Sequence, residues 1–150
     1  MRVIFCFLTL FCILCTTSCT YKDVKYQNCK NDFLCAEKIA GFHFLPEISI
    51  IKIKAKKGKI EITSLLNKTK NVTITKSAEE FFITKFLKEK LILDNGVEFL
   101  IKKDNNIIKK AYLGAESGYF EIQSNDGLSK EEIQKIYEIL AKAEAPVFPD

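Results

Sequence analysis

Arginine, histidine and tryptophan are almost missing from this chain of 150 residues, and these shortages exclude several classes of function. The sequence has one arginine, Arg2, one histidine, His43, and no tryptophan. Nucleic-acid binders usually carry arginines and a strong basic excess, whereas the net charge here is only +4, so no nucleic-acid partner is expected. A single histidine cannot supply the histidine pair of a metal site, and neither a metal nor another cofactor is expected.

Glycine and proline are also few, with six and three residues, and no glycine-rich phosphate loop or Gly-x-Ser-x-Gly motif occurs. Acidic pairs stand at 79–80 and 131–132, where helices are predicted to begin and carboxylates complement the helix dipole. His43 lies between Phe42 and Phe44, which is typical of a packed or partly exposed structural histidine. These features predict a protein that is not an enzyme.

The first 18 residues predict an export signal. Met1 and Arg2 give a short positive start, and the apolar run over 3–15 that follows is too short to span a membrane. Three small polar residues, Thr16 to Ser18, separate this run from Cys19. This order resembles the lipobox of bacterial lipoproteins, in the loose form typical of spirochaetal lipoproteins, since Thr16 replaces the usual aliphatic residue.

The resemblance implies that Cys19 is acylated with diacylglycerol and becomes the first residue of the mature chain. Two or more acyl chains anchor a protein stably to a bilayer. The protein would then lie in the cell envelope, on the inner or outer membrane, facing the periplasm or the outside. The alternative is a secreted soluble binding protein or inhibitor that is cut at the same place and carries no lipid.

Cysteine usage agrees with this export. Three of the six cysteines lie in the signal and Cys19 receives the lipid, which leaves Cys29 and Cys35. In an oxidising compartment this pair is expected to form a structural disulfide, with two free thiols as the alternative. Redox or metal chemistry is disfavoured, because redox dithiols usually have two intervening residues and this pair has five.

The remaining sequence predicts one domain of the α+β class, an antiparallel β-meander with a C-terminal amphipathic helix packed on one face. The domain is expected over 41–145, after a lipidated N-terminus and tether over 19–40 and before a tail over 146–150. Alternating apolar and polar residues predict a hairpin over 48–65 and further strands up to residue 122.

Two Ser-x-x-Glu patterns, at Ser77 and Ser129, predict helix starts. They favour helices over 78–89 and 130–143, and the second carries an apolar stripe at helical spacing. The phenylalanines of the first segment also suit a strand over 80–87, so this alternative stays open.

Lysines crowd into the first predicted hairpin, at Lys52, Lys54, Lys56, Lys57 and Lys59. A period of two places the first three on one solvent face, opposite Ile51, Ile53 and Ala55. A solvated strand face that discourages edge-to-edge aggregation explains this pattern. The functional interpretation is an anionic partner, which could be a lipid head group, a sulfated glycan or an acidic protein.

Overall fold

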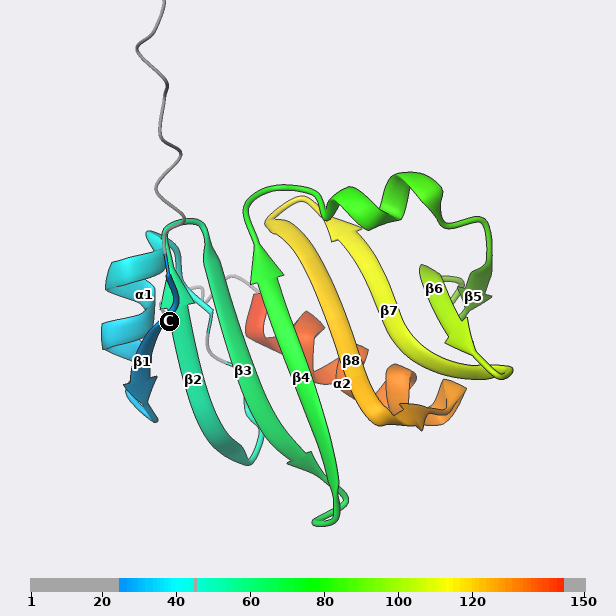
Figure 1. Cartoon of the computed structure of the whole chain (residues 1–150), viewed down its shortest axis with the longest axis horizontal. Coiled ribbons are helices and arrows are strands. Elements are labelled where there is room, and N and C mark those ends of the chain that lie inside the picture. Colours follow the sequence, from blue (N-terminus) through cyan, green and yellow to red (C-terminus); the bar gives the residue numbers. More distant parts are fainter. Residues whose placement is uncertain (1–24, 45, 145–150) are drawn as a thin grey trace, which may run out of the picture.

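Eight antiparallel strands form a single sheet in the order β1-β2-β3-β4-β8-β7-β6-β5 (Figure 1). The computed structural model describes residues 25–44 and 46–144, so the predicted signal, Cys19 and the predicted tail lie outside the described residues. The strands are β1 (Gln27–Lys30), β2 (Ile50–Lys56), β3 (Lys59–Leu66), β4 (Lys70–Ser77), β5 (Lys90–Ile92), β6 (Glu98–Asp104), β7 (Ile107–Ala115) and β8 (Gly118–Leu128). The helices are α1 (Phe33–Ala40), α2 (Lys130–Glu144) and the 3-10 helix η1 (Phe82–Phe86). The predicted α+β class is confirmed.

The sheet consists of two four-stranded meanders that meet at β4 and β8. Strands β1 to β4 follow one another in space, as do β5 to β8, and the pairing of β4 with β8 joins the two series. The two edge strands, β1 and β5, have only four and three residues. Short edges limit pairing with other chains.

One face of the sheet carries the hydrophobic core and helix α2, which crosses behind the strands in Figure 1. Isoleucines of the central strands are completely buried, and Ile133, Ile136 and Leu140 of α2 pack into the same cluster. Phe99 of β6 also meets Tyr137 of α2, with ring centroids 6.2 Å apart. The predicted amphipathic helix is thereby confirmed, and the other face of the sheet carries neither α1 nor α2 (Figure 1).

Helix α1 is fixed at both ends by local contacts. The Asp32 side chain accepts a hydrogen bond from the backbone N–H of Cys35, and Gly41 ends the helix in the left-handed region with φ +84°. The expected disulfide is confirmed, since Cys29 of β1 is bonded to Cys35 of α1. Residues 27–40 therefore belong to the folded domain, which begins before residue 41 and shortens the predicted tether.

The segment over 78–89 does not form the predicted α-helix, nor the alternative strand. Ser77 is the last residue of β4, and its hydroxyl accepts a hydrogen bond from the N–H of Glu79 at 3.2 Å, which closes a local turn. Phe81 is extended, with φ −72° and ψ 124°, and only the short helix η1 follows. The Ser-x-x-Glu pattern starts no α-helix here because Phe81 packs on Tyr112 of β7, with ring centroids 5.7 Å apart.

A bulge changes the expected alternation at the start of β2. The register between β2 and β3 shifts between Ile50 and Lys52, and Ile51 is consequently 48% exposed instead of buried. Beyond the bulge the prediction holds, because Ile53 and Ala55 are completely buried, while Lys54 and Lys56 alternate with them and leave from the opposite face.

A buried lysine occupies an inward position of β4. Lys76 is 5% exposed, and its ammonium lies 5.2 to 5.6 Å from the ring centroids of Phe42, Phe44 and Phe120. It also donates a hydrogen bond to the carbonyl of His43 at 3.5 Å. Three aromatic faces and a carbonyl replace part of the water that this charge loses on burial.

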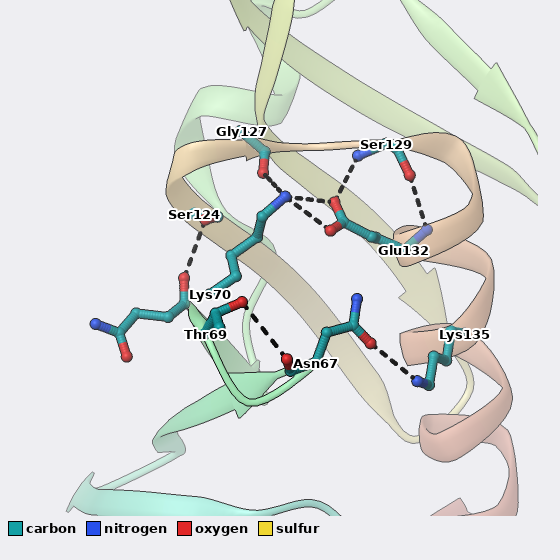
Figure 2. Close-up of polar contacts among 9 residues, drawn as sticks. Asn67, Thr69, Lys70, Ser124, Gly127, Ser129, Glu132 and Lys135 are labelled. Atoms are coloured by element: carbon teal, nitrogen blue, oxygen red, sulfur yellow. Dashed lines mark hydrogen bonds and ion pairs between the residues drawn. The ribbon is translucent and has the colours of Figure 1, made fainter.

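The start of α2 is tied to the hairpin between β3 and β4 by a lysine (Figure 2). The Glu132 carboxylate and the Ser129 hydroxyl form a reciprocal capping box, with hydrogen bonds of 2.9 and 3.1 Å. Lys70 donates to both carboxylate oxygens of Glu132, at 2.7 and 2.8 Å, and to the carbonyl of Gly127 at 3.1 Å. Burial raises the pKa of Glu132, but the Lys70 and Ser129 hydrogen bonds and the Lys70 charge outweigh it, so this pKa is lowered.

We expect the double variant Cys29→Ala/Cys35→Ala to lose about 2 kcal/mol of folding free energy, since the disulfide closes a short loop. Urea unfolding at equilibrium measures the loss. Wild-type protein kept in reductant is the control and should match the variant. A variant as stable as the oxidised wild type would show that the bridge contributes nothing.

The lowered pKa of Glu132 predicts that the free energy of unfolding depends on pH. Because the pKa of Glu132 is lowered on folding, its contribution is complete above the usual value of 4.5 and is lost as the pH falls through the folded value. Glu132→Gln keeps a capping side chain but removes the charge, and should cost about 1 kcal/mol at pH 7. Urea unfolding curves of variant and wild type should converge in acid, and a constant difference down to pH 3 would contradict this account.

Candidate functional site

The five lysines of the β2–β3 hairpin divide into two groups. Lys52 is exposed, and Lys54 lies 3.5 Å from the Glu61 carboxylate on the adjacent strand. Lys56, Lys57 and Lys59 surround the turn and line one wall of a groove of about 640 Å³. The structure thus brings three of the five predicted residues together and leaves Lys52 and Lys54 outside the groove.

The opposite wall of this groove, which we call the lysine groove, is formed by residues 77–82 at the end of β4. One backbone hydrogen bond joins the two walls, since the Gly58 carbonyl accepts from the N–H of Ala78 at 2.9 Å. The N–H of Gly58 donates to the carbonyl of Ala40, the last residue of α1, at 2.9 Å. Gly58 has φ +71°, a conformation that favours glycine in a tight hairpin turn. The groove therefore lies where the β2–β3 turn, α1 and β4 come together.

Aromatic rings accompany the lysines. The Lys56 ammonium lies 4.9 Å from the ring centroid of Tyr26, and the Lys59 ammonium lies 5.0 Å from that of Phe81. Burial and the neighbouring Lys56 charge lower the pKa of Lys59, although nearby carboxylates oppose them. An anion bound beside Lys59 would stabilise its protonated, charged form. The charge on Lys59 therefore favours a negatively charged ligand at this site.

Carboxylates moderate the charge of the groove. Glu79 and Glu80 belong to the wall opposite the lysines, and Glu80 accepts a hydrogen bond from the Thr84 hydroxyl at 2.7 Å. The groove is therefore cationic on one side and mixed on the other. Such a lining suits a surface that carries both phosphates and cationic or hydroxyl groups better than a single isolated anion.

Two tyrosines lie close to acidic side chains of the sheet, and one of them, Tyr112, is buried with 3% exposure. Burial, assisted by Glu61 and Glu121, raises the pKa of Tyr26 to about 12. Burial and the charge and hydrogen bond of Glu121 also raise the pKa of Tyr112. Both phenols remain protonated at neutral pH and can donate hydrogen bonds. Glu121 is itself paired with Lys110 at 3.1 Å.

His43 is more exposed than the packed or partly exposed position that its sequence context predicted. Its side chain is 93% exposed, and Nδ1 lies 2.9 Å from a carboxylate oxygen of Glu37. The other oxygen of Glu37 accepts a hydrogen bond from the backbone N–H of Phe44 at 2.8 Å. Within 25–44 and 46–144, no cluster of three histidine, cysteine or acidic side chains is arranged to hold a metal ion.

Sequence reasoning missed the aromatic half of the site. Tyr26 falls in the predicted tether, and Phe81 and Phe82 fall in a predicted helix that does not form. The signal in the sequence is the adjacent pair of phenylalanines, because two neighbouring residues of a strand or helix do not both point into the core. Phe82 is the one that stays outside the core, with 71% exposure.

Comparison of the chain with models of protein families, with curated proteins and with solved structures found no match. Among the residues that the structure describes, no helix combines the length and the apolar character that crossing a bilayer requires. The function of this chain is therefore inferred from its own sequence and structure.

Replacing Lys52, Lys54 and Lys56 together with glutamine should change the free energy of unfolding by less than about 1.5 kcal/mol, because solvent-facing substitutions usually cost within 0.5 kcal/mol each. The weak, partly exposed Lys54–Glu61 pair fits within this limit. Thermal unfolding measures the change. Ile53→Ala on the same strand is the control and should cost at least about 2 kcal/mol, because Ile53 is completely buried. A triple variant as unstable as this control would contradict the assignment of the two faces.

Proposed function

We propose that this protein is a bacterial lipoprotein, anchored to a membrane of the cell envelope through Cys19, with a binding or structural role and no enzymatic one. The observation that carries the proposal is the position of Cys19, directly after an apolar run and Ser18 and six residues before Lys25, where the described chain begins. Acyl chains on this residue would hold the domain at a bilayer without a spanning segment.

The disulfide supports export. Cys29 and Cys35 are bonded, and such bonds persist in oxidising compartments such as the bacterial periplasm or the cell surface. The bond also lies in the first part of the domain, where it fastens β1 to α1 next to the proposed anchor. In a domain held by its N-terminus, this covalent link keeps the first strand and helix attached to each other.

The lysine groove supports a binding role. Three lysines, two aromatic side chains and an open groove of about 640 Å³ suit an anionic partner that is held by charge and by contact with rings. A lipid head group, a sulfated glycan and an acidic protein all present such chemistry. Lysines act as point charges, so they favour a repeated anionic surface over one phosphate recognised in a bidentate manner.

Metabolic labelling with a clickable fatty acid tests the anchor. Wild-type protein should incorporate the label and fractionate with membranes, whereas Cys19→Ser should do neither, because the thiol that receives the lipid is gone. Ser18→Ala is a matched control, since it keeps a small residue before the cysteine and should still be labelled.

The alternative has its own outcome in this experiment. A wild-type chain that is cut after Ser18, takes up no label and is recovered in the soluble fraction would be a secreted binding protein or inhibitor. A Cys19→Ser chain that stays as membrane-bound as the wild type would contradict anchoring through this residue.

A further inference from the structure

We propose that the end of the sheet that carries the lysine groove and helix η1 rests on the anionic surface of the bilayer to which the chain is anchored. This inference rests on the proposed lipid anchor, and it identifies the anionic partner of the groove as phospholipid head groups of that same membrane. The domain would then have one fixed orientation with respect to the bilayer.

The described chain begins at the same end of the sheet as the lysine groove. Gln27, the first residue of β1, pairs with Ala55 next to the β2–β3 turn, and the Tyr26 ring is in contact with Lys56. Six residue steps separate Lys25 from Cys19. Since an extended chain covers at most about 3.5 Å per residue, this end of the domain stays within about 20 Å of the acylated residue.

Helix η1 lies at the same end of the molecule and carries a pair of phenylalanines (Figure 1). Phe82 is 71% exposed and Phe86 is 64% exposed, and their ring centroids are 5.2 Å apart in an edge-to-face contact. The Lys85 ammonium lies 5.8 Å from the Phe82 ring. Exposed aromatic side chains beside lysines are characteristic of surfaces that enter the head-group region of a membrane.

Positively charged side chains also gather at this end of the sheet. Five lysines lie at this end of the sheet, in the β2–β3 turn, in η1 and at the start of the described chain: Lys25, Lys56, Lys57, Lys59 and Lys85. Glu79, Glu80 and Glu116 lie in the adjoining turns, and the lysines of these turns outnumber them. Glu61 and Glu121 also act on Lys59, but they are paired with Lys54 and Lys110. A lysine close to an anionic bilayer strengthens binding roughly fivefold, and the short tether keeps this group within reach.

The proposed orientation has a structural consequence. The strands would point away from the bilayer, and the β3–β4 turn at the opposite end of the sheet would be the most distant part (Figure 1). The face of the sheet opposite α2 would be roughly perpendicular to the membrane surface and would not contact it.

Unacylated protein isolates this surface from the lipid anchor. The mature chain from residue 19 with Cys19→Ser would be mixed with vesicles of phosphatidylglycerol and phosphatidylcholine, and with phosphatidylcholine vesicles alone. Because the sequence has no tryptophan, Phe82→Trp provides a single fluorescent reporter. Leu65→Trp is the matched reporter, since Leu65 is 38% exposed and lies on β3 about 20 Å from Lys59.

With phosphatidylglycerol vesicles at low salt, the tryptophan at position 82 should shift its emission to the blue and be quenched by lipids brominated on the acyl chain. The tryptophan at position 65 should show neither change. Binding should weaken as salt rises, because the attraction is screened. Equal responses of the two reporters, or no binding to the anionic vesicles, would overturn the proposal.

Two triple variants test the lysines. Lys56→Gln/Lys57→Gln/Lys59→Gln should bind phosphatidylglycerol vesicles at least about tenfold more weakly. Lys52→Gln/Lys102→Gln/Lys142→Gln removes the same charge from exposed positions elsewhere and should bind nearly as well as the parent protein. Equal urea midpoints would show that both variants fold. Equal loss of affinity in the two variants would overturn the proposal, because net charge alone would then explain binding.

The outcome is separate from the test of the anchor. These measurements involve no acyl chain, so their failure leaves acylation of Cys19 unaffected, and failed labelling of Cys19 leaves the vesicle result valid. Binding to heparin or poly-glutamate without binding to the anionic vesicles would instead assign the groove to a soluble anionic partner and overturn the membrane assignment.

Discussion

The pairing of β4 with β8 is the contact on which the rest of this structure depends. It joins two meanders that are each built from neighbouring segments of the chain, and it places Ile74 opposite Ile122 in the centre of the core. Residues 78–117 separate these strands, so the loop that closes between them costs conformational entropy before any contact forms. Helix α2 directly follows β8 and can cover the core only once this pairing has brought both halves together.

The lysine groove depends on the same pairing. Ser77 ends β4 opposite Tyr119 of β8, and from this point residues 78–82 turn back toward the β2–β3 hairpin. Phe81 then reaches Tyr112 on β7 on one side and Lys59 on β3 on the other. One aromatic side chain thus links the two meanders at the end of the sheet where we place the membrane.

Charged side chains have three different environments in this domain. Lys70 is half-buried and satisfied by Glu132 and Gly127, where it holds the start of α2 on the β3–β4 hairpin (Figure 2). Lys76 is buried among aromatic rings of the core. Lys56 and Lys59 of the groove contact aromatic rings and stay partly accessible, which is what an electrostatic contact with a membrane requires.

The sequence by itself determined the class of fold, the disulfide, the helix at 130–143 and the side of β2 on which the lysines lie, because periodicity, capping patterns and cysteine pairing are local signals. It could not determine which strands are neighbours across the centre of the sheet, nor that residues 27–40 join the domain. It was wrong about 78–89, where a capping pattern was overridden by the packing of Phe81 on Tyr112. Only the tertiary structure decided that Tyr26, Lys59 and Phe81 meet, since residues distant in sequence come together through strand pairing, which no local pattern encodes.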